Sequence, residues 1–278
     1  LILDQDDIRN SPAKNTADLL DSIAGLSVRR SFGVAGSRTN LDLLGFGING
    51  NSNTLLLLNG RRITNPDSAA VNLSGIPLSA IKRIEILPGS GSALYGYGAS
   101  GGVINVVTLE QYDNNAGVTL SGGDFASQGA ELWGSAQSGD TSALANVSGF
   151  NSDGYRDNNE VRQRSAFIDV RQQFDALTLY LTTLADKERL GLPGTRVVIP
   201  GTQDQFEDDP QGTDTPSNWA REQRVHWMPG MELRHAEPLR FNSGSGQMEK
   251  KQPSLFPQFP HNPAAHIQPT TRRPRTSA

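Results

Sequence analysis

The chain has 278 residues, a net charge of −4 and no cysteine, and apolar residues make up 36% of it. The missing cysteines exclude disulfides, thiolate metal sites and a thiol nucleophile, and no run of about 18 apolar residues offers a membrane-spanning helix. The 29 glycines and 16 prolines favour turns and short strands over helical bundles. Outer-membrane strands leave only a weak sequence signal, so a membrane location stays open.

The first 110 residues read as a compact α+β region built from short elements. Its predicted strands are apolar and bounded by turn residues, and they cover 1–3, 26–28, 55–58, 83–87 and 102–108. A helix is predicted over 15–23, where Asn15 or Thr16 can cap it and Gly25 ends it. A further helical turn is predicted at 76–81.

The four consecutive leucines at 55–58 are the most informative of these strands. An unbroken apolar run is typical of a strand that is buried on both faces. The dipeptide Asn59-Gly60 follows directly, and it is a hairpin-type turn because both residues accept positive φ. We therefore expect a doubly buried strand that ends in a tight turn.

From about residue 116 the chain alternates apolar and polar residues. Five alternating segments are separated by Gly, Asp, Asn and Ser, and they cover 118–121, 130–136, 144–150, 166–170 and 177–182. Amphipathic strands at this spacing predict a meander, and hence a sandwich or a barrel. The residues alone favour a soluble sandwich, since alternation fits both architectures.

The rest of the chain carries a weaker strand pattern. Residues 191–218 are rich in Pro, Gly and acidic side chains, and they predict a long loop that in a barrel would be extracellular. Strand alternation continues through 231–234 and then fades. The tail at 260–278 has no alternation, no aromatic residue and no acid, so it cannot bury a core. It is either a natural disordered tail or an out-of-frame translation that begins near Phe259.

Two stretches, 45–50 and 96–101, match the pattern G-x-G-x-x-G. A dinucleotide site needs a helix directly after the pattern, so that the helix N-terminus meets the pyrophosphate. We expect no helix after either stretch, because an Asn-rich turn and the four leucines follow the first, and a β-branched strand follows the second. Nucleotide binding is therefore not expected, and no cofactor is predicted.

The charged clusters offer no catalytic or metal site. The acidic residues within 153–160 lack the spacing of a calcium-binding loop, and a solvated turn fits them better. The same holds for 207–209. The four histidines have no metalloprotease spacing. We therefore predict neither a metal site nor an enzyme.

Four segments between residues 8 and 108 share one further pattern. They are ADLL at 17–20 followed by GLSV at 25–28, LLLNGRR at 56–62, IPLSAIKRIEILPG at 76–89 and SALYGYGASGGVINVVT at 92–108. In this order they resemble the plug domain of TonB-dependent outer-membrane receptors. The resemblance replaces the soluble-sandwich prediction for the strands that follow.

The resemblance implies an α+β plug domain at 1–110, the first strands of an antiparallel transmembrane β-barrel at 116–259, and a disordered or out-of-frame tail at 260–278. It implies a receptor of the Gram-negative cell outer membrane that takes up an iron–siderophore chelate, haem, cobalamin or an oligosaccharide. Its implied partners are the TonB complex, a small-molecule or metal-chelate ligand and outer-membrane lipid, with no nucleic acid. The alternative is a soluble plug-like module with a β-rich extension, which binds a ligand or a periplasmic partner.

The resemblance also marks individual residues. Those matching the plug motifs are Asn59, Gly60, Arg61, Arg62, Arg83, Glu85, Gly96, Gly101 and Gly102. For ligand contact we predict the apices that contain Gly33, Ser37, Asn65 and Asp67, from their position between strands. The glycines are expected to let the plug loops pack closely against the barrel wall.

Three departures from the family pattern matter. Leu44 stands where the family commonly has an Arg, which joins the plug Glu, here Glu85, in a charge network with barrel carboxylates; Arg61 or Arg62 is the predicted substitute. The chain starts after the usual position of the TonB box. Only about seven strands are counted between 116 and 250, against about 22 in the plugged transporter barrels. We therefore expect a truncated or mis-translated fragment of a receptor.

Overall fold

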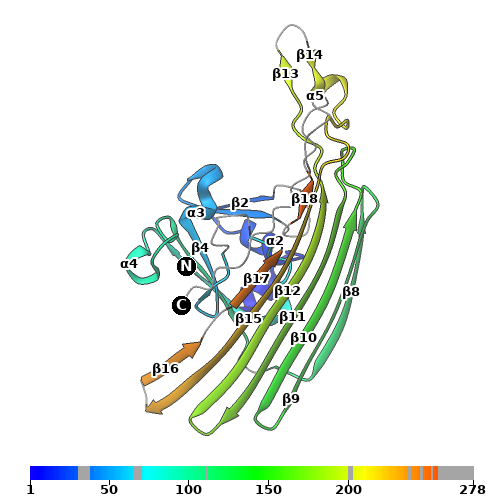
Figure 1. The fold of residues 1–278 in the computed structure, drawn as a ribbon. Helices are drawn as coiled ribbons and strands as arrows, with labels where there is room; N and C mark the ends of the chain where they lie inside the picture. The colour runs from blue at the N-terminus through cyan, green and yellow to red at the C-terminus, as the bar shows by residue number, and fades with distance from the viewer. Residues whose placement is uncertain are drawn as a thin grey trace.

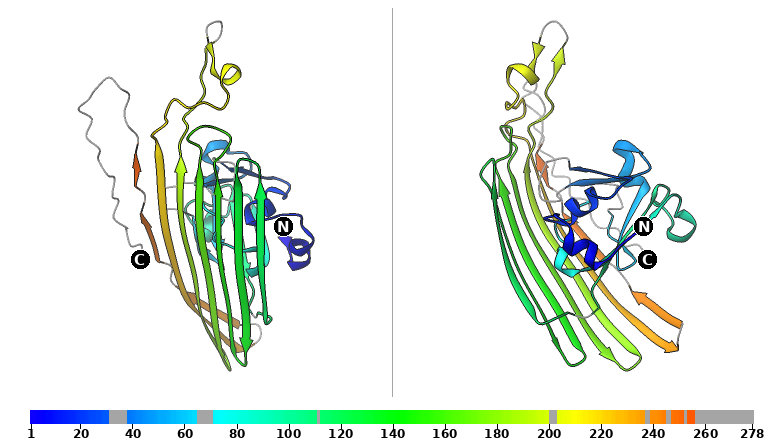
Figure 2. Two further views of the ribbon diagram at one scale, coloured as in Figure 1. Left: turned by 90° about the vertical axis from the view of Figure 1, so that its right-hand side faces the viewer. Right: turned by 180° about the vertical axis from the view of Figure 1, so that it is seen from behind.

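The computed structural model describes residues 1–30, 38–64, 71–110, 112–199, 203–236, 239–244, 247–251 and 253–255. These residues form an N-terminal body of short helices and strands, and a curved sheet of nine strands (Figure 1). The N-terminal body lies against the concave face of that sheet (Figure 2). The predicted tail at 260–278 lies outside the described residues.

Five short strands form the main sheet of the N-terminal body, in the order β1-β6-β7-β4-β5. They are β1 (Ile2–Leu3), β4 (Thr54–Leu58), β5 (Arg61–Arg62), β6 (Ile81–Pro88) and β7 (Gly102–Thr108). β4 and β7 are parallel, and the other neighbours are antiparallel. A separate antiparallel pair joins β2 (Leu26–Arg30) to β3 (Thr39–Leu43). The α+β prediction for this region is confirmed.

The helices are short. α1 (Gln5–Asn10) begins with a capping box between Asp4 and Asp7, and the side chain of Asn15 accepts the Asp18 amide at the start of α2 (Thr16–Asp21). The others are η1 (Gly47–Asn49), α3 (Gly50–Asn53), η2 (Leu78–Ala80), α4 (Ser92–Tyr95) and α5 (Gln205–Asp208). The predicted helix over 15–23 thus forms over a shorter span, and α1 and α4 were not predicted. No helix in the described part of the chain is long and apolar enough to cross a membrane.

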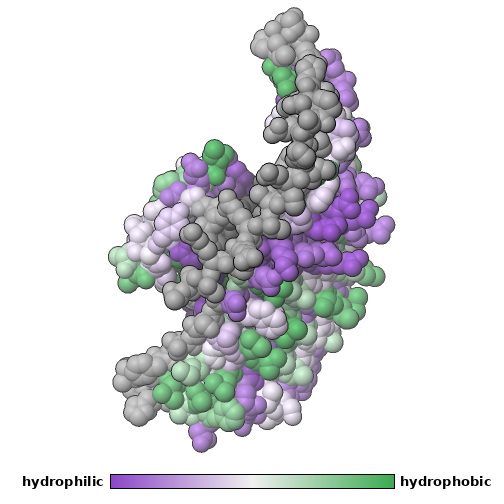
Figure 3. Space-filling view, viewed as in Figure 1, coloured by the Kyte–Doolittle hydropathy of each residue, from purple (hydrophilic) through white to green (hydrophobic). Residues whose placement is uncertain are grey.

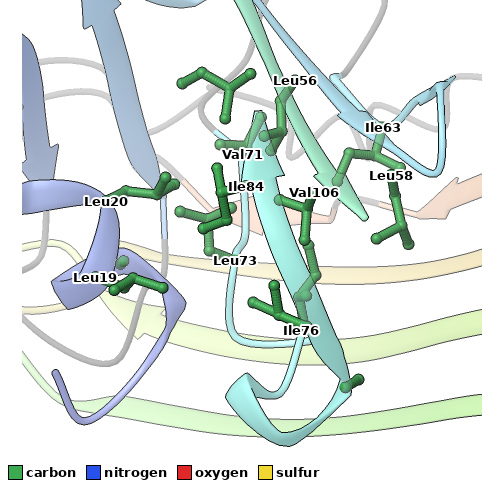
Figure 4. Packing of buried hydrophobic residues seen from close by; sticks show 14 of the residues in the cluster. Leu19, Leu20, Leu56, Leu58, Ile63, Val71, Leu73, Ile76, Ile84 and Val106 are labelled. Atoms are coloured by element: carbon green, nitrogen blue, oxygen red, sulfur yellow. The ribbon is translucent and has the colours of Figure 1, made fainter. Parts of the chain in front are cut away.

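Strand β4 is buried along its whole length, as the four leucines predict. Leu56 and Leu58 enter the main core of the N-terminal body (Figure 4). The other two leucines pack on the opposite face of the sheet, in a smaller cluster. The turn to β5 is the predicted one, with positive φ at Asn59 (51°) and at Gly60 (77°).

The larger sheet is called the wall sheet from here on. Its strands run in the order β16-β15-β12-β11-β10-β9-β8, with β17 and β18 also paired to β15, and all neighbours are antiparallel. The strands are β8 (Asn115–Gly123), β9 (Ser127–Ser138), β10 (Thr141–Ser152), β11 (Val161–Phe174), β12 (Leu177–Gly191), β15 (Trp219–Ala236), β16 (Leu239–Gly244), β17 (Gln247–Lys251) and β18 (Ser254–Leu255). Each of the five predicted alternating segments lies within one of β8 to β12. The strands continue beyond residue 234, where the sequence pattern fades, because pairing with β15 supports them.

The two ends of the wall sheet differ in their connections. At one end, called the turn end, two residues join β9 to β10 and two join β11 to β12. At the other, the loop end, residues 153–160 join β10 to β11, and residues 192–199 and 203–218 form an arm that rises above the sheet (Figure 1). The predicted long loop is not without structure, because the arm carries α5 and the strand pair β13 (Val198–Ile199) and β14 (Gln203–Asp204).

The two faces of the wall sheet have opposite character. The concave face buries polar and charged residues, which include Gln163, Ser165, Asp169, Arg171, Thr182, Asp186, Glu188, Glu222, Arg224 and His226. The convex face exposes large apolar residues, which include Val118, Leu120, Leu132, Val147, Ile168, Val170, Leu179, Leu181, Trp227, Met231 and Leu233. This is the inverse of a sheet that faces water, whose exposed face is polar.

Candidate functional site

The contact between the N-terminal body and the wall sheet is the candidate functional site. The core of the N-terminal body continues into the wall, because Leu144, Phe167, Leu184 and Met228 belong to the same buried cluster. Around this apolar centre, polar side chains of the two bodies meet. The two bodies therefore share one core that is framed by specific polar contacts.

Arg38, just before β3, reaches two carboxylates of the wall sheet. Its Nε lies 3.2 Å from Oε1 of Glu188 on β12, and its Nη2 lies 3.4 Å from Oε2 of Glu222 on β15. Glu222 also lies 3.2 Å from Nε of Arg224, which lies 3.1 Å from Asp186. All four wall side chains are buried. A cation of the N-terminal body is thus held by a buried charge network of the wall.

This network corrects the prediction that Arg61 or Arg62 takes the place of the family's Arg at Leu44. Arg61 does cross to the wall, but it donates to the main-chain oxygen of Met228 (2.7 Å) and to the Tyr180 hydroxyl (2.9 Å). Arg62 donates to a main-chain oxygen within its own body. The reason is position: the β4–β5 hairpin meets β12 nearer the turn end than Glu188, so its guanidinium groups do not reach that carboxylate.

A second polar contact between the N-terminal body and the wall sheet involves Asn59, one of the predicted motif residues. The Asn59 side chain holds the end of β7, accepting the Thr108 amide (2.9 Å) and donating to the Thr108 hydroxyl (2.9 Å). The same hydroxyl accepts a hydrogen bond from Nη2 of Arg171 on β11 (2.8 Å). Arg171 is itself paired with the buried Asp169 at 2.7 Å. One threonine therefore connects the turn motif to a buried ion pair of the wall.

Three other predicted motif residues form a row across the sheet of the N-terminal body. The Gly60 amide donates to Oδ1 of Asn105 (2.9 Å), whose Nδ2 donates to Glu85 (2.8 Å). Nε of Arg83 donates to the other Glu85 oxygen at 2.7 Å. Partial burial raises the pKa of Glu85, but the hydrogen bonds from Asn105 and Arg83 and the Arg83 charge outweigh it, so the pKa is lowered overall. These contacts run along the sheet, not across to the wall.

The two G-x-G-x-x-G stretches pack against each other, because a Cβ at Gly101 would lie 2.8 Å from the ring of Phe46. The atoms nearest to a Cβ at Gly50, Gly98 or Gly101 all belong to the N-terminal body, not to the wall as expected. In the first stretch, the amides of Phe46 and Gly47 donate to the Asp42 carboxylate at 2.8 and 2.6 Å. In the second, the Gly101 amide donates to the Asn53 oxygen at 2.7 Å, and a Cβ at Gly101 would lie 3.1 Å from that oxygen. The anion held by the first stretch therefore belongs to the chain itself.

The prediction that no helix follows either stretch is wrong for the first one. Helix α3 begins at Gly50, where a Cβ would lie 2.6 Å from the side chain of Asp42, so this glycine lets α3 lie directly on β3. After the second stretch comes β7, as expected. Gly96 ends α4, and Gly102 has φ 145° at the start of β7, where a Cβ would lie 2.6 Å from the Leu87 oxygen.

The predicted ligand contacts at Gly33, Ser37, Asn65 and Asp67 fall outside the described residues. The polar segment 153–160, considered above as a calcium loop, instead holds the base of the arm. Arg156 donates to the main-chain oxygens of Pro193, Gly194 and Gly212, and Asn158 to those of Leu192, Thr215 and Asn218. Across the described ranges, no three metal-ligating side chains lie together.

A curved antiparallel sheet that is apolar outside, polar inside and packed around a separate body is the arrangement of a plugged outer-membrane barrel. Within the described residues the sheet does not close on itself. Sequence comparison leads to the same class. The family model of the TonB-dependent receptor plug domain matches residues 2–103.

Two curated relatives share this region. The vitamin B12 transporter BtuB of Vibrio vulnificus is 34% identical over 122 residues, which cover 44% of this chain and 19% of the relative. The ferric enterobactin receptor PirA of Pseudomonas aeruginosa is 30% identical over 129 residues, which cover 42% of this chain and 17% of the relative. The matches thus span less than a fifth of either relative.

Solved structures extend the likeness over most of the chain. The ferric citrate transporter FecA in its unliganded form has a TM-score of 0.73 at 15% identity, covering 91% of this chain and 40% of that one. The siderophore receptor PirA from Pseudomonas aeruginosa has a TM-score of 0.64 at 20% identity, covering 92% and 41%. The likeness shows a shared fold. The family match identifies residues 2–103 as the plug domain of a TonB-dependent receptor. The N-terminal body is called the plug from here on.

Proposed function

We propose that the receptor of which this chain is a part imports a ligand across the outer membrane, and that the plug shifts against the wall sheet to let the ligand pass. The proposed ligand classes are iron–siderophore chelates, haem, cobalamin and oligosaccharides, and the TonB complex is the proposed source of the pull. Relatives named as a vitamin B12 transporter and a ferric enterobactin receptor support cobalamin and the iron–siderophore chelates among these classes. We further infer a plug at 1–110, a wall from about residue 116, and no enzymatic step.

The observation that carries the proposal is the kind of contact between plug and wall. Apart from the shared core, the bodies meet through separate polar contacts, such as the Arg38 ion pairs, the Ser74–Ser165 hydroxyl pair at 3.0 Å and the Gln163–Asn72 hydrogen bond at 3.1 Å. A neutral hydrogen bond of this kind stabilises by about 0.5–1.5 kcal/mol. Water can replace such bonds one at a time, so they position the plug and still allow it to move.

The orientation of the wall follows from its two ends. In outer-membrane barrels the short turns lie on the periplasmic side and the longer loops lie outside the cell. We therefore assign the turn end of the wall to the periplasm and the loop end to the exterior. The arm then projects outwards, where an incoming ligand first meets the receptor.

The alternative of a soluble plug-like module is disfavoured by the convex face. Val118 on β8, Leu132 on β9 and Ile168 on β11 are 66%, 55% and 45% exposed, and the other exposed apolar residues of that face lie on the same sheet. Soluble monomers rarely expose apolar patches above a few hundred Å². Lipid is the medium in which such a face is stable.

Uptake by cells tests the transport proposal. Gram-negative cells that lack their own receptors and produce the receptor that contains this chain are given labelled ferric siderophores, haem, cobalamin or oligosaccharides, with and without TonB. We expect uptake of one class that disappears without TonB. Uptake of none of the four classes, or uptake that is independent of TonB, would contradict the proposal.

A disulfide between plug and wall tests whether the plug must move. Because the sequence contains no cysteine, only the introduced thiols can form this bond. In the variant Ser74→Cys/Ser165→Cys the new thiols replace hydroxyls 3.0 Å apart across the plug–wall contact. The control Ser127→Cys/Ser152→Cys joins two wall strands whose hydroxyls are also 3.0 Å apart. Oxidation should stop uptake in the first variant only, and reduction should restore it. Normal uptake through a fully oxidised plug–wall pair would exclude movement at this contact.

A further inference from the structure

Five cationic residues gather on the convex face of the wall sheet near its loop end, and we call them the cationic belt. They are Arg162 and Arg164 on β11, Lys187 and Arg189 on β12, and Arg221 on β15. The strand register sets them directly opposite one another: Arg162 faces Arg189, Arg189 faces Arg221, and Arg164 faces Lys187. Like charges in directly opposed positions destabilise a sheet. The belt therefore costs stability unless something else neutralises it.

No acidic side chain of the described residues neutralises the belt. None of its five cations forms an ion pair with a described carboxylate, and the shielded Nε of Arg221 has no hydrogen-bond partner there. The concave face of the same strands is different. Its arginines, Arg171 and Arg224, are each paired with a buried aspartate. These two concave-face arginines are thus paired, whereas the five belt cations are not paired with any described carboxylate.

The belt borders the apolar part of the convex face. One outward row nearer the turn end, the register aligns Ala166, Ala185 and Val225. The next row holds Ile168, Thr183 and Trp227. On three adjacent strands the outer surface therefore changes from cationic to apolar between one row and the next. Figure 3 shows the same division on the face it presents, with hydrophilic residues above hydrophobic ones.

We propose that the cationic belt binds the phosphate groups of anionic lipid headgroups in the outer leaflet of the membrane. This inference rests on the proposed insertion and orientation of the wall. With the apolar rows in the acyl chains, the belt lies at the depth of the headgroups, where lipid phosphates are the neighbouring anions. Arg guanidinium groups form forked hydrogen bonds to phosphate, and four of the five cations are Arg.

The belt favours a lipid over free phosphate because of its shape. Its side chains stand on the convex sheet face and are spread over three strands. A lipid adds the burial of its acyl chains along the apolar rows directly below, so headgroup and chain bind together. Attraction to an anionic membrane surface contributes roughly fivefold in affinity for each Lys or Arg.

The test uses the full chain and vesicles of defined composition. Binding is measured by flotation with phosphatidylcholine vesicles and with vesicles that also contain phosphatidylglycerol. The belt variant is Arg162→Gln/Arg189→Gln/Arg221→Gln, and Arg162→Lys/Arg189→Lys/Arg221→Lys keeps the charge. The control Arg9→Gln/Lys14→Gln/Arg29→Gln removes the same charge from exposed plug positions. Circular dichroism checks that each variant keeps its β-structure.

We expect the wild type, the Lys variant and the plug control to prefer the anionic vesicles, and the belt variant to lose roughly 100-fold of that preference, from three cations at about fivefold each. Native mass spectrometry in detergent should show retained phosphatidylglycerol on the wild type and not on the belt variant. An unchanged preference in the belt variant, or displacement of the lipid by millimolar inorganic phosphate, would overturn the lipid site while membrane insertion stands. Failure of the wild type to associate with either vesicle would overturn both the site and the proposed insertion.

Discussion

The plug and the wall sheet use the same residue types in opposite arrangements. In the plug, apolar side chains such as Leu56 and Ile104 are fully buried, and the charged pair Arg83–Glu85 lies near the surface. In the wall, charged pairs such as Asp186–Arg224 are buried, and apolar side chains such as Ile168 are exposed. The arrangement of the wall fits the proposed insertion, with lipid outside and the plug inside.

Burial alone therefore does not identify which face of a strand stabilises the fold. A β-strand presents successive side chains to opposite faces, whatever the medium on each side. In the proposed membrane setting, the apolar face of the wall is stabilised by contact with lipid. The polar face is stabilised by ion pairs and hydrogen bonds within the wall and with the plug. Substitutions in the two bodies test this difference.

The buried charges of the wall should be the most sensitive positions. The substitution Arg224→Ala leaves Asp186 and Glu222 without their central cation, and breaking a buried pair in this way costs about 3–5 kcal/mol. Denaturant unfolding of the chain in lipid vesicles measures the loss. The double variant Arg224→Ala/Asp186→Asn should recover part of it, because one of the two stranded charges is gone. Equal losses in the single and double variants would show that the pair is not the cause.

The plug should respond as an ordinary water-soluble core. Leu56 has no exposed surface, so Leu56→Ala leaves a cavity and should cost about 2–5 kcal/mol. The matched control is Leu94→Ala in α4, where the leucine is 82% exposed and the loss should be near zero. The same unfolding measurement, followed by protection of the plug from proteolysis, separates the two. Similar behaviour of both variants would refute the core assignment.

Placing a cation at an exposed apolar position should cost stability in the wall and little in the plug. Ile168→Arg puts a cation into the lipid-facing rows and should cost about 2–4 kcal/mol. Ile48→Arg changes an isoleucine of the plug that is 84% exposed, and it should be nearly neutral. Recovery of each variant in the membrane fraction, and its unfolding in vesicles, measure the difference. If Ile168→Arg is as harmless as Ile48→Arg, lipid does not cover this face.

Acid should weaken the plug through Glu85, with a smaller effect. Its lowered pKa means that the carboxylate stabilises the fold above its unfolded value near pH 4.3, and that this contribution is lost as the pH falls through the folded value. Because the side chain is 36% exposed, we expect below about 1 kcal/mol. Glu85→Gln should lower stability at pH 7, and its deficit should shrink below about pH 4.3. A deficit that is independent of pH would assign the effect to shape and not to charge.

Much of the plug follows from local sequence. The four adjacent leucines predict a strand that is buried on both faces. Asn59-Gly60 predicts a turn with positive φ, and Asn15 supplies the N-cap of α2. The alternation from residue 116 likewise requires amphipathic strands. The charge partners of Arg38 could not be predicted in this way, because Glu188 lies 150 residues further along the chain. Only the packing of the plug against the wall brings the two together.

Local sequence is enough to specify most helices, strands and turns, because propensity, turn geometry and periodicity act over a few neighbouring residues. It also determined the resemblance to the receptor plug, which is carried by short motifs. What only the tertiary structure decided is which medium each strand face meets. Alternation is symmetric between the two faces, so the plug on the concave side had to be in place before the polar side chains could be assigned inwards and the apolar ones outwards to lipid.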